Sequence, residues 1–291
     1  MRSTRHAKTL LPVLAALLLL LANATAAKTR SELRSNEGSF DVYNDYLIVV
    51  QGSVGPLRGL KFLLDTGQTF SSIDRRIAEK LNLTKRQGAV FNIDKMSSVE
   101  WANVTDFAYG PQHVSDIRVM IEDLRYLRAN ASIDGVIGLD LLRRTNFRLD
   151  LIARRILFGT TEKLAARSVP MHADGICLKV ELEFDGRPVW MIADTGMKGI
   201  VFYQDQLDSM AANYRVQRQI TGISLGGPIR YTPALVARLR LGTQDLDRQV
   251  YLVPASTNPL LQHTAGYLGL ATLNAKIIEF DFDHNELRWS K

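Results

Sequence analysis

Cysteine is almost absent from this chain of 291 residues, which contains a single one, Cys177. One cysteine excludes an intramolecular disulfide, and its apolar neighbours in ICLKV predict a buried, unreactive side chain. Long hydrophobic runs are missing after residue 26, so we expect no membrane span beyond that first segment. The histidines have no partners at metal-ligand spacing, and there is no Gly-Lys-Ser/Thr loop. The sequence therefore predicts no metal ion and no cofactor.

The chain also has little excess of either charge. Its formal net charge is +6, and three of its basic residues, Arg2, Arg5 and Lys8, lie in the first segment. Without them the net charge is about +3, and the remaining basic residues are scattered along the chain. Tyrosine and tryptophan are dispersed as well, so no stacking platform is indicated. These patterns argue against a nucleic-acid partner.

Residues 1–26 have the features of a secretory signal peptide. The three basic residues are followed by an apolar run, Leu10 to Leu21, and by small-x-small patterns that end at Ala24 and Ala26. The apolar run is too short for a comfortable transmembrane helix, which needs about 20 residues. We expect an exported protein, periplasmic or secreted, because an exported chain without disulfides fits a bacterial periplasm. If the segment is not cleaved, the protein is membrane-tethered.

An apolar strand pattern runs into Asp-Thr-Gly twice, in FLLDTG ending at Gly67 and in MIADTG ending at Gly196. Upstream, YLIVVQGSVGPLRGLKFLLDTG aligns with GICLKVELEFDGRPVWMIADTG without a gap. Downstream, GVIGLDLLRRTNFRLDLIARRILF aligns with GYLGLATLNAKIIEFDFDHNELRW in the same way. The order of elements is therefore the same in both halves, and the period is too long for a solenoid repeat. The sequence predicts a duplicated small domain.

Short strands, frequent glycine-containing turns and few helical patterns predict an all-β fold with two homologous, β-barrel-like lobes and few short helices. A short helix is expected in AEKLNL, residues 78–83, and a strand in LVARLRLG, residues 235–242. The predicted segments are a signal peptide at 1–26, an N-terminal lobe at 38–158, a polar connector at 159–174 and a C-terminal lobe at 175–290.

Asp65 and Asp194 end equivalent strands of the two halves. A lone Asp-Thr-Gly is a common turn, but symmetric lobes that pack around a pseudo-twofold axis bring equivalent residues together. Two neighbouring carboxylates share one proton, because like charges disfavour the second ionisation. One carboxylate can then take a proton from water while the other protonates a substrate carbonyl. The repeated motif thus favours hydrolysis of an amide without metal, serine or cysteine.

The paired motifs resemble the pepsin/retropepsin superfamily of aspartic proteases, in a single-chain, two-lobed, bacterial form. The apolar-apolar-x-Asp-Thr-Gly pieces at 62–67 and 191–196 are each followed by an apolar-apolar-Gly piece, at 136–138 and 267–269. The resemblance implies that these glycine strands cross beside the Asp loops and complete a ψ-shaped motif. It also implies a catalytic dyad and supporting loop residues: Asp65 and Asp194, with Thr66, Gly67, Thr195 and Gly196.

Two features depart from the family pattern. Three residues after the aspartates, where the family usually has Ser, Thr or Ala, the chain has Gln68 and Met197. The resemblance also implies a flap, a hairpin that closes over the substrate, and both 88–104 and 219–236 are candidates. Pepsins usually place a tyrosine in the flap of the first lobe, where this sequence has none at a matching position and Trp101 is a candidate substitute. The sequence leaves open which hairpin closes.

Two other functions compete with this interpretation. GISLG, residues 222–226, matches the Gly-x-Ser-x-Gly elbow of serine hydrolases, but Gly227-Pro228 follows it instead of a helix. A catalytically silent module could bind a peptide or protein on the same fold by strand addition. The sequence favours a monomeric aspartic endopeptidase with a peptide or protein substrate, and the silent binding module is the alternative.

Overall fold

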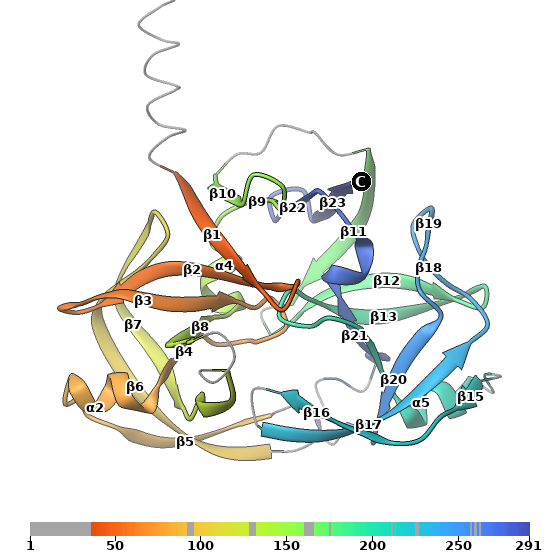
Figure 1. The fold of residues 1–291 in the computed structure, drawn as a ribbon, viewed down its shortest axis with the longest axis horizontal. Coiled ribbons are helices and arrows are strands. Elements are labelled where there is room, and N and C mark those ends of the chain that lie inside the picture. The colour runs from red at the N-terminus through yellow and green to blue at the C-terminus, as the bar shows by residue number, and fades with distance from the viewer. Residues whose placement is uncertain are drawn as a thin grey trace, which may run out of the picture.

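The structure is a computed structural model in which two β lobes lie side by side (Figure 1). Its strands and few short helices confirm the predicted all-β fold. The described residues are 36–91, 96–127, 132–159, 166–174, 176–210, 212, 214–224, 227–256, 258, 261 and 263–291. The predicted signal peptide, residues 1–26, lies outside them. No helix within the described ranges has the length and apolar character needed to cross a bilayer.

The N-terminal lobe is built on a closed barrel. Strand pairing runs from β2 through β3, β8, β4, β7 and β6 and returns to β2. The pairs β3–β8 and β4–β7 are parallel, and Phe62 and Phe107 meet inside at 5.1 Å between ring centroids. The strands of this half are β1 (Glu37–Tyr43), β2 (Leu47–Val54), β3 (Leu57–Leu64), β4 (Ser72–Asp74), β5 (Arg86–Phe91), β6 (Met96–Tyr109), β7 (Gln112–Glu122), β8 (Gly135–Ile137), β9 (Phe147–Asp150) and β10 (Arg155–Phe158).

The C-terminal lobe repeats this pairing with one break. The path runs from β12 through β13, β21, β14 and β20 to β17, and the chain passes directly into β18, which pairs with β12. The strands of this half are β11 (Arg167–Ala173), β12 (Leu178–Phe184), β13 (Arg187–Asp194), β14 (Ile200–Tyr203), β15 (Tyr214–Val216), β16 (Ile220–Ser224), β17 (Gly227–Val236), β18 (Leu239–Leu241), β19 (Gln244–Asp245), β20 (Gln249–Val253), β21 (Gly266–Gly269), β22 (Ile277–Asp281) and β23 (Glu286–Ser290). The single long β6 of the first lobe thus corresponds to β17 plus β18.

Both halves contribute to one antiparallel sheet that joins the lobes, in the order β1–β10–β9–β22–β23–β11. At its centre Phe147 of β9 stacks on Phe280 of β22, with ring centroids 4.4 Å apart. Arg148 Nε, on the opposite face of the same pair of strands, donates to Glu279 Oε1 at 2.6 Å. The shared sheet is therefore continuous across the boundary between the two halves, and it fixes how the lobes face each other.

Helices are few, as the sequence predicts. They are α2 (Arg75–Lys80), α4 (Leu139–Leu142), α5 (Gln204–Ser209) and the 3-10 helix η2 (Leu270–Leu273). Helix α2 lies close to the predicted segment but starts earlier, because the Asp74 carboxylate accepts from the amide of Arg76 and caps its first turn. The predicted strand at 235–242 is present as the end of β17 followed by β18.

The second half of the predicted connector forms strand β11. This strand pairs with β23 in the shared sheet and with β12 in the C-terminal lobe. Val169 and Met171 alternate with more exposed neighbours and are buried, so this part of the connector contributes to the core. Because β11 belongs to both sheets, it ties the C-terminal lobe directly to the shared sheet.

Candidate active site

The two Asp-Thr-Gly loops leave equivalent strands of the two barrels. Strand β3 ends just before Asp65 and runs parallel to β8, while β13 ends at Asp194 and runs parallel to β21. The amide of Asp65 continues the first ladder by donating to the Ile137 carbonyl at 3.0 Å. Strands β8 and β21 also pair antiparallel with β4 and β14. In each lobe a glycine-containing strand therefore lies beside the Asp loop, in the ψ-shaped arrangement that the resemblance implies.

The threonines of the two loops link the lobes reciprocally. Thr66 Oγ1 donates to the Ala193 carbonyl at 2.7 Å and accepts from the Thr195 amide at 3.1 Å. Thr195 Oγ1 donates to the Leu64 carbonyl at 2.7 Å and accepts from the Thr66 amide at 3.0 Å. Both threonines are buried. This double interlock holds the two loops in a fixed relation across the pseudo-twofold axis.

The glycines of the motif allow each loop to approach the opposite aspartate. A Cβ at Gly67 would lie 2.4 Å from Asp194 Oδ2, and a Cβ at Gly196 would lie 2.5 Å from Asp65 Oδ2. No side chain fits at these distances, so glycine is required at both positions by close approach. The structure thus brings together all six site residues predicted from the sequence.

Asp65 and Asp194 are buried, and their carboxyl groups are hydrogen-bonded to each other. Burial raises the pKa of Asp65, while the bond to Asp194 and the amides of Gly67 and Gln68, at 2.8 and 3.1 Å, favour its ionised form. Burial and the neighbouring charge of Asp65 hold the pKa of Asp194 well above its usual range. The two carboxyl groups therefore share one proton and titrate as a pair.

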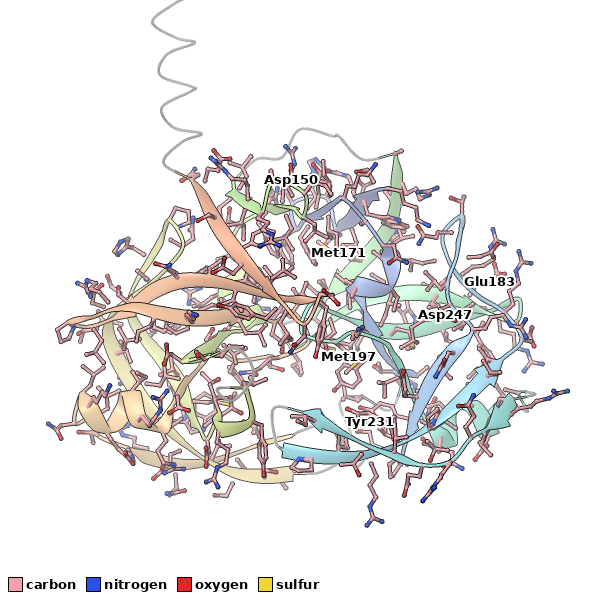
Figure 2. All side chains as sticks on the ribbon, in the orientation of Figure 1. Asp150, Met171, Glu183, Met197, Tyr231 and Asp247 are labelled. Carbon is pink, nitrogen blue, oxygen red and sulfur yellow. The ribbon has the colours of Figure 1, made fainter. Side chains whose placement is uncertain are left out.

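The two departures from the family pattern behave differently. The backbone amide of Gln68 donates to Asp65, but its side-chain Nε2 donates to the Phe70 carbonyl at 2.6 Å and to Ser72 Oγ at 3.3 Å. Met197 packs in an apolar cluster with Ile229, Tyr231 and Tyr251. Figure 2 shows Met197 and Tyr231 on the side of the C-terminal lobe that faces the other lobe. Gln68 and Met197 therefore each act on one aspartate of the dyad through a backbone amide, and the Met197 side chain also makes its surroundings apolar.

Two tyrosines near the dyad are absent from the sequence-based prediction. Burial, followed by the charge of Asp194, raises the pKa of Tyr231 to about 12, and Tyr46 contributes to this shift. Burial and the charges of Asp194 and Asp65 also raise the pKa of Tyr46. Tyr46 precedes β2, and Tyr231 lies on β17. Tyr231 lies in the second lobe, whereas the family pattern places the flap tyrosine in the first. Its hairpin is nevertheless one of the two candidate flaps.

The β16–β17 hairpin extends toward the N-terminal lobe (Figure 1). A Cβ at Gly227, at the start of β17, would lie 3.3 Å from the ring of Tyr126, so this end of the hairpin touches the other lobe. The tip of the first-lobe candidate, residues 92–95 between β5 and β6, lies outside the described residues. Trp101 is buried in that hairpin, edge-on to Phe70 and beneath Arg118.

Cys177, Ser224 and two further aspartates lie at places where the fold, and not a reaction, explains them. Cys177 is buried, and burial raises the pKa of its thiol to about 12. Ser224 ends strand β16 and β17 begins at Gly227, so the serine is not followed by the helix that a nucleophile elbow requires. Asp150 of the first half and the equivalent Asp281 of the second half accept backbone amides in the turns of the final hairpins. Within the described ranges no group of three or more His, Cys, Asp or Glu is placed to hold a metal ion.

The fold and the paired loops define a two-lobed aspartic-protease architecture. Residues 50–141, most of the N-terminal lobe, match a family model described as Aspartyl protease. This match confirms the resemblance to a retropepsin-like aspartyl protease family and supports a protease role. A comparison with curated proteins found no match.

Proposed function

We propose that this chain is an aspartic endopeptidase that hydrolyses peptide bonds with a water molecule activated between Asp65 and Asp194. The observation that carries the proposal is the pair of buried carboxyl groups, hydrogen-bonded to each other across the two lobes. A single buried carboxyl would be a structural residue, but two that share a proton provide a base and an acid in one site.

In the proposed reaction, the ionised Asp65 takes a proton from water as the water oxygen attacks the peptide carbonyl carbon. Asp194 gives its proton to the carbonyl oxygen, which yields a neutral tetrahedral intermediate. The carbon–nitrogen bond then breaks. The proton held by Asp65 goes to the leaving amine, a hydroxyl proton of the intermediate returns to Asp194, and the pair recovers its single proton. No metal or covalent intermediate takes part.

The substrate would lie between the lobes, with the β16–β17 hairpin acting as the flap. Two observations favour this hairpin: its contact with Tyr126 in the other lobe and the influence of the dyad on its Tyr231. Because both aspartates come from one chain, we infer that a monomer is active. With the predicted signal peptide, the protein would process exported proteins in the periplasm or outside the cell.

The test is a cleavage assay of the chain from Lys28 onward on a mixed peptide library across acidic to neutral pH. Asp65→Asn and Asp194→Asn should each lower cleavage by at least about 10²-fold, since general acid–base catalysis contributes that much. Asp185→Asn, in the exposed turn between β12 and β13, is the matched control. Folded wild-type protein that binds peptides and never cleaves them would instead favour the silent binding module.

A further inference from the structure

A third carboxyl group, Glu122, lies behind the Asp65 loop. It ends β7, which runs parallel to β4 so that Met120 pairs with Ser72 and Glu122 pairs with Asp74. Strand β4 directly follows the loop that contains Asp65 and Gln68. A residue 57 positions after Asp65 is therefore brought against the loop by strand pairing alone, and the proposed mechanism does not use it.

Two oxygen atoms at this place lack a hydrogen-bond partner among the described residues: Gln68 Oε1 and Glu122 Oε2. Both atoms are buried. The nitrogen of the Gln68 side chain donates to the Phe70 carbonyl and to Ser72 Oγ, and the Gln68 side chain also acts on Glu122 through a hydrogen bond. Two buried acceptors without a donor destabilise the fold, because neither oxygen recovers the hydrogen bonds that it made with water. A proton on Glu122 turns one of the two acceptors into a donor.

The surroundings favour that proton. Burial raises the pKa of Glu122 and the charge of Asp65 adds to the shift, while the Ser72 hydroxyl and the Gln68 side chain oppose it. The neighbouring acids are paired elsewhere. Asp74 on β4 accepts from Arg76 and from the Leu124 amide, and Asp123 pairs with Arg125.

The adjoining strand β6 contributes one more acid, Glu100, next to β7 through its pairing with Ile121. Glu100 forms salt bridges with Arg75 and Lys85. The cations of this region are therefore paired with other carboxylates. Asp65 is the one ionised group that acts on Glu122 strongly enough to shift its titration.

We propose that Glu122 is a positioning residue for the dyad, which in its protonated form donates a hydrogen bond to Gln68 Oε1. That bond holds the loop whose backbone amides, at Gly67 and Gln68, donate to Asp65. The ionised form would repel both Gln68 Oε1 and Asp65, and the loop would lose its support. The inference rests on the proposed function for its effect on cleavage, but its structural part does not.

The direction of the pH effect follows from the raised pKa of Glu122. The unfolded chain titrates near the usual glutamate value, about 4.3, and the folded protein titrates above it. The stabilisation that protonated Glu122 provides is therefore complete below the pKa of the unfolded chain. It is lost as the pH rises through the pKa of the folded protein. Cleavage should fall over the same interval, because the loop loosens as Glu122 ionises.

The experiment compares wild type with Glu122→Gln, whose amide has the same shape and can donate to Gln68 Oε1 at any pH. We expect the alkaline limb of the cleavage profile to move up by about one pH unit, the usual spread of carboxyl pKa values in proteins. Glu79→Gln, on the exposed face of α2, is the control and should leave the profile unchanged. A profile that is the same in all three proteins would overturn the proposal.

A second variant and a second readout separate this proposal from the proposed function. In Gln68→Met, which lacks the acceptor, a further Glu122→Gln change should shift the profile less than it does in wild type, because only the charge effect on Asp65 remains. Independently of cleavage, the backbone amide resonances of Gly67 and Gln68 should shift with pH in wild type, and one titration step should vanish in Glu122→Gln. If the protein cleaves no peptide and the titration step is nevertheless present, the proposed function fails and the positioning role of Glu122 stands. Absence of the step overturns the positioning role.

Discussion

The hydroxyl groups of Thr66 and Thr195 each make one bond to a carbonyl and accept one amide of the opposite loop. These bonds lie in the interior between the lobes, where water does not replace them. A change at either residue therefore acts on both loops. This makes the pair a sensitive test of how the dyad is held, without touching the carboxyl groups themselves.

We expect Thr66→Val, which keeps the shape and removes the hydroxyl, to leave the Ala193 carbonyl and the Thr195 amide unpaired. The free energy of unfolding should fall by about 2–6 kcal/mol, since each of the two unsatisfied buried groups costs about 1–3 kcal/mol. Urea denaturation measures this loss, and cleavage should fall with it. Thr66→Ser keeps the hydroxyl and is the control. Equal stability of the valine and serine variants would contradict the interlock.

At the scale of single residues, the sequence identifies those whose motif is repeated. Asp65, Asp194 and their Thr-Gly neighbours are recognised because two copies of the same signal occur at equivalent places. Gln68 is noticed as a departure, but its side-chain direction depends on Phe70 and Ser72 in the folded loop. Tyr46 and Glu122 have no counterpart in a motif. Glu122 approaches the dyad through the long-range pairing of β7 with β4, which no local pattern specifies, and Tyr46 approaches it from the turn before β2, the hairpin partner of β3.

Among the elements, the β16–β17 hairpin has the largest predicted effect on substrate binding. Tyr231 packs against Tyr251, with ring centroids 6.1 Å apart, and covers Gly222, where a Cβ would lie 2.5 Å from its ring. Gly222 thus leaves room for the ring within the hairpin. The Tyr231 ring is held between Tyr251 and Gly222. Its removal should therefore change the conformation of the whole hairpin and not only one contact.

We expect Tyr231→Ala to lower kcat/KM at least about tenfold, a loss of roughly 1.4 kcal/mol of transition-state binding. The ring would no longer shield the dyad from water. Steady-state kinetics on a single cleavable peptide measure the change. Tyr231→Phe keeps the ring and should stay close to wild type. An alanine variant with wild-type kinetics would rule out this hairpin as the flap.

The repeat made the elements predictable, because each strand pattern occurs twice in the same order. The helix near 78–83 and the strand at 235–242 follow from local spacing. The break between β17 and β18 could not be foreseen, because the first lobe crosses the equivalent place with one continuous strand, β6. The place of β11 in the core was missed for another reason. Its alternation of buried Val169 and Met171 with exposed residues is short and lies beside polar sequence.

For the whole molecule, the buried pair Arg148–Glu279 in the shared sheet is the most sensitive contact between the halves. Arg148 is 14% exposed and Glu279 is fully buried. We expect Arg148→Met to lower the free energy of unfolding by about 3–5 kcal/mol, because it leaves a buried carboxylate without its partner. Denaturant unfolding measures this loss.

The matched control is Arg155→Met, on the neighbouring strand β10. Arg155 pairs with Glu37 at the surface, where its side chain is 52% exposed. Loss of such an exposed pair changes the stability little, because water and salt screen its charges. If both variants lose the same stability, Arg148 has no special role in joining the lobes.

The closure of each barrel was beyond what the sequence specifies. A duplicated β domain predicts which strands exist, but the return of β6 to β2, with Tyr109 opposite Gly52, joins residues far apart in the chain. The register of such pairs is set when the whole lobe packs around Phe62 and Phe107. The shared sheet depends in the same way on both halves at once.

The order of strands in that sheet has a consequence for the time at which the two aspartates come together. Strands β22 and β23 are translated after all the other strands described, yet they occupy the interior of the sheet, between β9 and β11. A growing chain can fold its first lobe early, since domains form from the N-terminus onward during synthesis. The second lobe cannot dock until residues up to Ser290 have left the ribosome. We expect that a partly made chain contains no complete dyad, so that the proposed proteolysis would begin only after synthesis is finished.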